Sequence, residues 1–323
     1  MALLKQAYEI QTDNIKRKIL VYGQPGIGKS TLALSMPNPV LIDADNGVHR
    51  IAPVHRVPTL QVTSYQEVLD LLDSGELSPF DTIVIDTAGK LLDYINVHII
   101  QENPKNGRGG GQLTQQGWGA RAQKFNALLR TVTTMGKHLV FVAHEKEERD
   151  ADTKVVRPDF GGGKAGNELI KDLDLVGYME ALGRERTISF APSDKYYAKN
   201  AARINDVLMI PTLTDGTPND FLSGIVNQCD EAARDESAQR QEYDKVMMQV
   251  LDLIDCIEDA DTANKAGAKI QKLPQVWDSL IRARSMYAEK VKALGLKYDK
   301  IQKSYVSETT ADQQQESPSE EVA

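Results

Sequence analysis

Nine consecutive residues combine glycines, a lysine and hydroxyl side chains at the spacing that phosphate binding requires. They are Gly23, Gln24, Pro25, Gly26, Ile27, Gly28, Lys29, Ser30 and Thr31. Glycines let a backbone curl until successive N–H groups point at one anion. In this motif Lys29 is expected to reach the β- and γ-phosphates of ATP, and the Ser30 hydroxyl is expected to bind Mg²⁺. A glycine-rich turn without a ligand is the alternative, but the flanking predicted strand and helix favour a phosphate loop.

A second element of the same chemistry is Asp86, which ends the apolar run at residues 82–86. A carboxylate at the carboxyl end of such a strand is the usual outer-sphere partner of Mg²⁺ beside a phosphate loop. The alternative is an aspartate that only opens the next loop. The phosphate loop earlier in the chain favours the metal site.

Polar residues at two other strand ends are candidates for activating water. Asp45 is a candidate general base, with Asp43 supporting it or the metal, because strand ends beside a phosphate loop form the floor of the site. A plain Asp/Asn/Gly turn at residues 43–47 is an equally good interpretation. His144 follows another apolar run and is placed to sense the γ-phosphate or water. A strand-end histidine that faces solvent is the alternative.

The elements that must position these residues alternate along the first part of the chain. Apolar β-rich runs occupy residues 18–22, 39–43, 82–86 and 138–143, and helical patterns occupy residues 30–36, 64–72 and 122–133. Continuous apolar strands separated by helices predict an α/β fold with a mostly parallel, doubly wound sheet covered on both faces. Residues 175–182 and 187–191 flank Gly183 and predict an added antiparallel hairpin.

The chain changes character from about Phe221. No further β-rich run is evident, and helices are predicted at about residues 238–258, 262–271 and 275–303. The polar, acidic end of the chain has the composition of a disordered tail. The sequence therefore predicts a core at residues 1–225, a helical C-terminal module at 226–306 and a disordered acidic tail at 307–323.

Composition limits the function classes. The 323 residues carry a net charge of −8, so the chain as a whole does not attract nucleic acid, and any such contact needs local basic stretches. Its two cysteines, Cys229 and Cys256, have no metal-ligand spacing and indicate a reducing compartment. No apolar run has the length of a membrane span, so a cytoplasmic protein without a membrane partner is expected.

Four segments in this order resemble the RecA-like ATP-binding proteins of phages, the Sak-type single-strand annealing ATPases of the RecA/RadA superfamily. The segments are residues 23–31, 41–47, 82–87 and 140–145, with a weaker fifth at 196–203, and the resemblance covers about residues 15–225. It implies a RecA-like P-loop core and ATP-dependent binding of single-stranded DNA for annealing or strand exchange. It also implies a homo-oligomeric ring or filament in the cytoplasm of a phage-infected bacterium, with a single-strand DNA-binding protein as a further candidate partner.

The resemblance also assigns residue roles. Asp45 falls where such proteins carry a catalytic carboxylate, usually Glu, and His144 falls where they carry a γ-phosphate sensor, commonly Gln. Lys199 and, less closely, Arg203 fall near a basic segment that reaches the ATP of a neighbouring subunit in RecA-like filaments.

Two glycine-rich basic stretches are candidate DNA-binding loops, because single-strand binding needs cations along the backbone and an aromatic stacking surface. The first, at residues 103–121, contains Lys105, Arg108, Trp118 and Arg121. The second, at residues 145–166, contains Lys154, Arg157 and Lys164 after an acidic start. Mobile surface loops whose glycines serve only flexibility are the alternative.

Two other function classes compete with a DNA-dependent ATPase. One is a nucleotide-switched binding module with little turnover that serves a replication or recombination protein. The other is a small-molecule kinase, which is disfavoured because no Arg-rich lid follows the phosphate loop.

Overall fold

The computed structural model describes residues 15–150, 153–161, 170–202, 204, 207–214 and 216–307. The chain falls into two compact units with their boundary between Asp230 and Glu231, inside the helix α6 (Phe221–Asp255). The predicted boundary at 225/226 falls in the same helix. Residues 308–323 of the predicted tail lie outside the described part of the chain.

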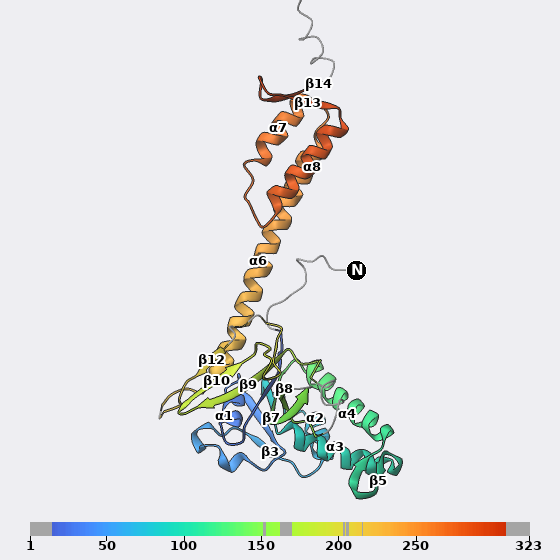
Figure 1. The fold of residues 1–323 in the computed structure, drawn as a ribbon, viewed down its shortest axis with the longest axis vertical. Coiled ribbons are helices and arrows are strands. Elements are labelled where there is room, and N and C mark those ends of the chain that lie inside the picture. The colour runs from blue at the N-terminus through green and yellow to red at the C-terminus, as the bar shows by residue number, and fades with distance from the viewer. Residues whose placement is uncertain are drawn as a thin grey trace, which may run out of the picture. The chain divides into compact units, whose positions relative to one another are not determined.

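The first unit is built on one large sheet, mostly parallel as predicted (Figure 1). Across the described residues its order is β12-β10-β9-β1-β7-β4-β2-β3. These strands are β1 (Lys18–Gly23), β2 (Pro39–Asp43), β3 (Thr59–Gln61), β4 (Thr82–Asp86), β7 (His138–Asp150), β9 (Leu175–Leu182), β10 (Glu185–Ser189) and β12 (Val207–Ile210). The predicted hairpin is confirmed, since β9 and β10 pair antiparallel around Gly183.

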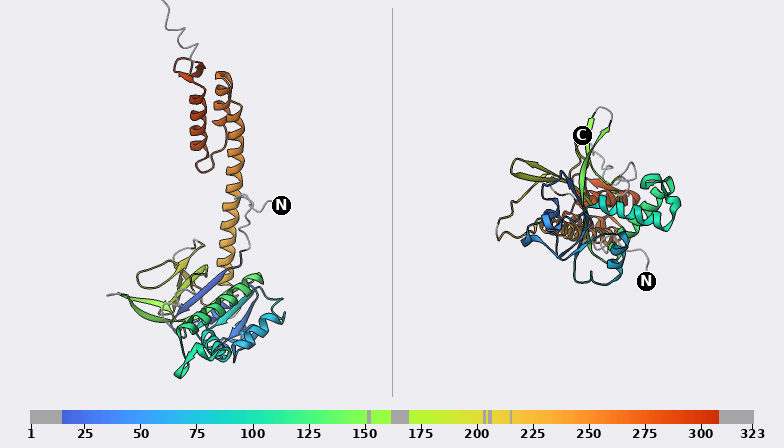
Figure 2. Two further views of the ribbon diagram at one scale, coloured as in Figure 1. Left: turned by 90° about the vertical axis from the view of Figure 1, so that its right-hand side faces the viewer. Right: turned by 90° about the horizontal axis from the view of Figure 1, so that it is seen from below.

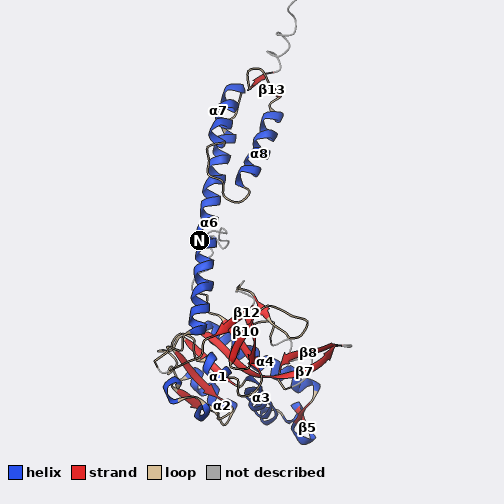
Figure 3. Cartoon of the chain, turned by 60° about the vertical axis from the view of Figure 1, so that its left-hand side comes forward, coloured by secondary structure: helices blue, strands red, loops and turns tan. Residues whose placement is uncertain are grey.

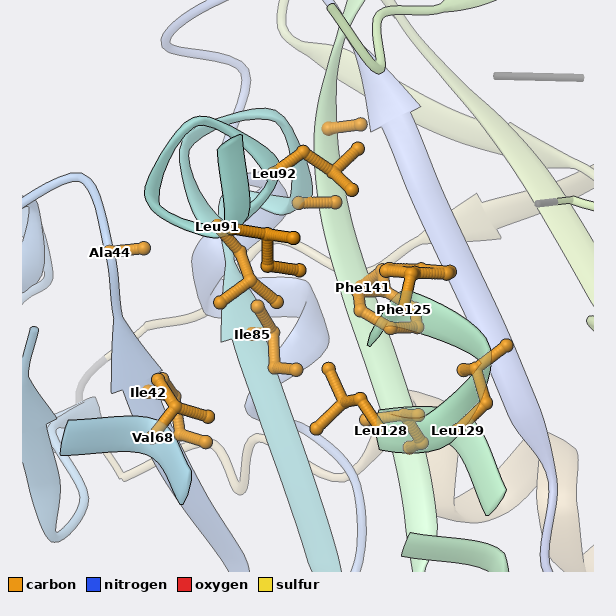
Figure 4. Packing of buried hydrophobic residues seen from close by; sticks show 14 of the residues in the cluster. Ile42, Ala44, Val68, Ile85, Leu91, Leu92, Phe125, Leu128, Leu129 and Phe141 are labelled. Atoms are coloured by element: carbon orange, nitrogen blue, oxygen red, sulfur yellow. The ribbon is translucent and has the colours of Figure 1, made fainter. Parts of the chain in front are cut away.

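Helices cover both faces of this sheet. Successive side chains of each central strand point to opposite faces. They are α1 (Lys29–Ala33), α2 (Tyr65–Asp73), α3 (Ala88–Glu102) and α4 (Gln115–Thr134), and Figure 2 shows α3 and α4 beside each other. On one face Leu91 and Phe125 from the helices pack with Ile85 and Phe141 from the strands (Figure 4). On the other face the α1 residue Leu32 packs with strand residues and with the start of α6. The central strand residues at 19–22, 40–42, 83–85 and 139–143 are therefore apolar on both faces of the sheet.

The sequence analysis missed α3 and placed the start of α4 too late. Thr87 and Thr114 cap these helices by accepting a hydrogen bond from the backbone N–H groups of Lys90 and Gly117. Glycines at residues 117 and 119 lie inside α4 although they favour loops locally. Packing of the later α4 residues against the sheet explains why the helix tolerates them.

The two stretches predicted as loops contain strands. Residues 145–150 of β7 pair antiparallel with β8 (Thr153–Pro158), so the second stretch begins as a β-hairpin. The first stretch contains β5 (Gly107–Arg108) paired with β6 (Gln112–Leu113). A two-stranded ribbon with polar residues on both faces lacks the apolar alternation that marks a half-buried strand, and this is why it was missed.

The second unit contains the later part of α6, then α7 (Ala260–Ile270), α8 (Ser279–Ala293), β13 (Leu296–Asp299) and β14 (Ser304–Ser307). Val246 and Val250 of α6 pack with Ala263 and Ala283, as the apolar spacing of α6 predicted. α7 and α8 lie side by side (Figure 3).

The prediction of one helix through residues 275–303 is wrong. α8 ends at Ala293, Gly295 adopts a φ of 65°, and the chain returns as the β13–β14 hairpin. A left-handed residue suits Gly and ends a helix. None of the described helices has the length and apolar character needed to cross a membrane.

Candidate nucleotide site

The phosphate loop joins β1 to α1 at the carboxyl edge of the parallel strands. At two positions of this loop the structure requires or strongly favours glycine. A Cβ on Gly23 would lie 2.3 Å from the carbonyl oxygen of Met179, and Gly28 adopts a φ of 97° directly before α1. Side chains are excluded at the first position by space and disfavoured at the second by conformation. The loop can therefore turn its backbone N–H groups toward one anion.

Lys29 lies within the loop and is only 5% exposed. Its Nζ donates a hydrogen bond of 2.6 Å to the carbonyl oxygen of Gln24. Burial lowers the pKa of this ammonium, while the carboxylates of Asp86 and Glu145 act in the opposite direction. A buried cation that borders a cavity and faces carboxylates is suited to binding a polyanion together with a metal ion.

Ser30 and Asp86 come together from α1 and β4 although another strand, β7, lies between β1 and β4. The Ser30 hydroxyl donates a hydrogen bond to the Asp86 carboxylate. Burial raises the pKa of Asp86, the nearby carboxylates of Asp43 and Asp45 raise it further, and Ser30 and Lys29 oppose the rise. The excess of negative charge favours a cation at this point.

The residues present fit Mg²⁺ bound mainly by its substrate. In the described part of the chain, no cluster of three or more His, Cys, Asp or Glu side chains is arranged to hold a metal by itself. One hydroxyl from Ser30 and one carboxylate from Asp86 leave most positions for phosphate oxygens and water, which is how Mg²⁺ is usually held beside a phosphate loop.

The turn at residues 43–50 follows β2 and places Asp45 beside the phosphate loop and Asp86. Both Asp43 carboxylate oxygens accept backbone hydrogen bonds, from Gly47 at 2.8 Å and from Val48 at 2.9 Å. Asp43 therefore holds the turn in shape. Asp45 lies beyond it, and its Oδ2 accepts a hydrogen bond of 2.8 Å from Nη2 of Arg50. The Asp/Asn/Gly turn is therefore present, Asp45 lines the phosphate cavity, and its role as general base stays a prediction.

His144 extends β7 between the phosphate loop and β4. It is paired in register with Gly23, and its Nδ1 is buried without a hydrogen-bond partner among the described residues.

The residues of the candidate site line one cavity of about 190 Å³. It is lined by Pro25, Gly26, Gly28, Lys29, Ser30, Thr31, Asp45, Gly47, Arg50, Ile51, Asp86, Thr87, Val142 and His144.

A family model described as an AAA domain matches residues 15–202 of the chain. The chain belongs to this AAA-domain family. Its first unit is accordingly a P-loop ATPase domain of the nucleotide-binding and hydrolysing type. A search among curated proteins found no match.

Within the first unit, a second cavity of about 280 Å³ was not foreseen from the sequence. It shares Gly28 and Thr31 with the phosphate cavity, so the two adjoin at the start of α1. Its lining includes Met179, Ile210 and Phe221. These apolar residues come from distant segments and carry no motif, which is why sequence patterns did not find them.

Glu145 is a further site residue that the sequence analysis did not single out. Its charge acts on Lys29, and its Oε2 is buried without a hydrogen-bond partner in the described structure. Tyr178 lies against it, and the pKa of that phenol is raised mainly by burial and then by Glu145. The only available signal was its position directly after His144.

Lys199 does not line the phosphate cavity of its own AAA domain. It lies in β11 (Lys199–Asn200), which pairs with Val176 and Leu175 at the start of β9, whereas Gly23 pairs with Met179 further along that strand. Its Nζ donates to the carbonyl oxygens of Lys171 and Leu173. The predicted contact of Lys199 with the ATP of a neighbouring subunit stays a prediction. Arg203 lies outside the described residues.

Arg121 corrects the first predicted DNA loop. It is 1% exposed, and its Nη1 donates to the carbonyl oxygens of Phe160 and Gly161 at 3.4 and 3.0 Å. Its guanidinium lies 4.2 Å from the ring centroid of the partly buried Trp118. A DNA contact by Arg121 is wrong for this structure, because its charge is enclosed and bonded within the domain. Lys105 and Arg108 are exposed.

The second predicted DNA stretch neutralises much of its own charge. Lys154 is paired with Glu147 at 3.0 Å, and Arg157 is paired with Glu148 at 3.1 Å, because β8 folds back onto the acidic end of β7. The expectation that the later half offers free cations does not hold for these two residues. Lys164 lies outside the described residues.

Proposed function

We propose that this AAA domain hydrolyses ATP with Mg²⁺ and uses the cycle to bind and anneal single-stranded DNA, as a Sak-type recombination ATPase of a phage does. The observation that carries the ATPase part is the meeting of Lys29, Ser30, Asp86, Asp45 and His144 around one cavity. The chemistry is phosphoryl transfer to water, which depends on positioning and charge neutralisation.

The residues take the following roles in the proposed reaction. The phosphate-loop N–H groups and Lys29 hold the β- and γ-phosphates and offset the negative charge that develops on the γ-phosphoryl oxygens. Asp45 orients the attacking water and accepts its proton. His144 contacts the γ-phosphate or that water. Mg²⁺, held through Ser30 and Asp86, supplies further charge neutralisation when it is bound.

The adjoining cavity takes the base and ribose in this proposal. Its volume is about 280 Å³, its apolar lining residues Met179, Ile210 and Phe221 suit a flat ring, and Arg186 and Asp220 add polar groups that suit a ribose. It shares Gly28 and Thr31 with the phosphate cavity, so the two cavities adjoin.

The DNA part of the proposal rests on the family resemblance and on two exposed cations. Arg108 belongs to β5, and Lys105 lies in the turn just before it, near the start of the helix that carries Trp118. Because the chain has a net charge of −8, local cations must supply the attraction. Assembly into a ring or filament, in the cytoplasm and alongside a single-strand DNA-binding protein, belongs to the same proposal.

A nucleotide-switched binding module with little turnover is the second candidate. The ion pair between Asp45 and Arg50 favours it, because a carboxylate oxygen already bonded to a guanidinium is less available to an attacking water. In this case ATP binding itself is the signal, and a replication or recombination protein is the partner.

One assay tests these functions together. ATP turnover is measured with and without single-stranded DNA, alongside a gel shift at fixed salt with ATP, with ADP and without nucleotide. Turnover stimulated by DNA, together with an ATP-dependent shift, supports the annealing ATPase. Absence of any shift and of stimulation overturns the DNA part, and ATP-dependent capture of a protein partner then supports the binding module. Wild-type protein that neither binds nor hydrolyses ATP overturns both.

A further inference from the structure

We propose that Arg50 exchanges its carboxylate partner for the γ-phosphate of ATP, and so makes Asp45 available to water only when a triphosphate is bound. The proposal rests on the proposed ATPase function and adds a residue to it. Sequence patterns gave Arg50 no role, and the role comes from its position at the junction of the catalytic carboxylate and the phosphate cavity.

The first observation is the position of the guanidinium. Nη2 of Arg50 lies 2.8 Å from Oδ2 of Asp45, and both residues line the cavity formed by the phosphate loop, Asp86 and His144. The Arg50 side chain is 60% exposed, whereas that of Asp45 is 25% exposed. An exposed arginine has room to turn from one anion to another inside the same cavity.

The second observation is that Gly47 leaves the space that the Arg50 guanidinium occupies beside the 43–50 turn. A Cβ on Gly47 would lie 2.6 Å from Nη2 of Arg50 and 3.2 Å from its Cζ. Because Gly47 has no side chain, the Arg50 guanidinium can lie across the turn and reach Asp45. The Asp43 carboxylate fixes the turn by accepting hydrogen bonds from Gly47 and Val48. The Arg50–Asp45 contact therefore belongs to a well-supported local structure.

A neighbouring arginine, Arg56, binds only backbone groups among the described residues and so shows what a purely structural arginine does in this segment. Arg56 donates from Nε to the carbonyl oxygen of Ile51 and from Nη2 to that of His49, each at 2.9 Å. Its guanidinium holds backbone in place and does not line the phosphate cavity. Arg50 differs because its strongest partner is a charged side chain that can be replaced by another anion.

The exchange follows from charge and geometry. A γ-phosphate carries more negative charge than one carboxylate and offers several oxygens to the planar fork of an arginine. When ATP enters, the guanidinium moves to the phosphate and Asp45 loses its partner. The freed carboxylate then orients water. With ADP there is no γ-phosphate, and the Arg50–Asp45 pair remains.

The test compares affinities for two nucleotides, using the full chain with Mg²⁺. Calorimetry gives the Kd for ADP and for the β,γ-imido analogue of ATP in wild type, Arg50→Ala, Arg50→Lys and the control Arg130→Ala. Arg130 is an exposed arginine on α4, away from the cavity. We expect Arg50→Ala to weaken the imido analogue by about tenfold or more while ADP changes by less than about twofold. Arg50→Lys retains part of the preference, and Arg130→Ala retains all of it.

Three outcomes of this test overturn the inference. Equal changes in both Kd values mean that Arg50 only shapes the turn, and unchanged values mean that it does not contact the phosphate. Faster ATP turnover in Arg50→Ala means that the guanidinium merely restrains Asp45, whereas the exchange requires slower turnover. Wild-type protein that fails to bind ATP is a different failure, because it removes the proposed function before Arg50 is tested.

A double-variant cycle separates exchange from simple repulsion between Asp45 and the phosphates. Asp45→Asn removes the competing charge, so it should tighten the imido analogue more in the presence of Arg50 than in the Arg50→Ala background. Equal tightening in both backgrounds contradicts the exchange. The ADP affinity, measured in the same four proteins, shows whether each variant is folded and binds nucleotide.

Discussion

Two glycine-rich basic segments of the first unit each bury a cation, and they use it differently. Lys29 in the phosphate loop borders a cavity and is surrounded by the carboxylates of Asp86 and Glu145. Arg121 in α4 is 1% exposed, donates to the carbonyl oxygens of Phe160 and Gly161, and lies against the ring of Trp118. A buried cation that borders a cavity and lies near carboxylates is suited to binding a ligand. A buried cation whose partners are backbone carbonyl groups stabilises the fold.

The strongest way to test this contrast is to remove the ammonium of Lys29. Lys29→Ala should lower ATP turnover by about 10³-fold or more, because no other described cation lies inside the phosphate loop. Steady-state phosphate release measures the loss. Far-UV circular dichroism and the unfolding midpoint should stay near wild type, and retained turnover would overturn the site assignment.

Asp45→Asn tests the carboxylate on the other side of the same cavity. The variant keeps the size of the side chain but removes its basicity, so turnover should fall by about 10²-fold while nucleotide affinity is not lost. Single-turnover hydrolysis and nucleotide titration measure the two quantities separately. Unchanged turnover would move the water-activating role elsewhere, and Glu145 would be the next residue to replace.

Arg121 should give the opposite result in the same assays. Arg121→Ala leaves two carbonyl groups without their donor and removes the packing against Trp118, so it should lower the free energy of unfolding by about 2–4 kcal/mol. Urea unfolding measures the loss. The turnover of the fraction that remains folded should match wild type, and a selective loss of DNA binding in a fully stable variant would restore Arg121 as a DNA contact.

The exposed cations of the first segment should affect DNA alone. Replacing Lys105 and Arg108 together with Ala should weaken single-strand binding by about tenfold and reduce its salt dependence, because fewer counterions are then released. Filter binding at several salt concentrations measures both. Basal ATP turnover should not change, and a matched double variant on α6 of the second unit, Arg234→Ala with Lys245→Ala, controls for the loss of two positive charges.

The smallest expected effect is a change in the melting temperature when Asp86 is replaced. The pKa of Asp86 is shifted upward, which is opposite to the usual shift for a carboxylate in a folded protein. Burial raises its pKa above the unfolded value, so its contribution to stability is present at low pH and is lost as the pH rises through the folded pKa. Asp86→Asn should therefore raise the melting temperature at neutral pH by a few degrees without nucleotide. Differential scanning calorimetry at pH 5 and pH 8 checks this, and the gain should be larger at pH 8.

The sequence determined the sheet and the nucleotide motif because both depend on local pattern. Apolar runs at residues 18–22, 39–43 and 82–86 became β1, β2 and β4 since buried parallel strands are apolar on both faces. The phosphate loop was equally clear, because glycine, lysine and serine at this spacing satisfy one backbone geometry. Asp86 and His144 followed from the rule that parallel strands present their carboxyl ends at one edge.

The tertiary structure decided which polar residues are available. The sequence placed Arg121, Lys154 and Arg157 in basic loops, but folding enclosed the first and paired the others with Glu147 and Glu148. It also brought Arg50 into contact with Asp45 and assembled a second cavity, lined by apolar and polar residues, beside the phosphate loop. A side chain's partners depend on segments that lie far apart in the chain. Local sequence therefore predicts the type of site, and packing determines which residues complete it.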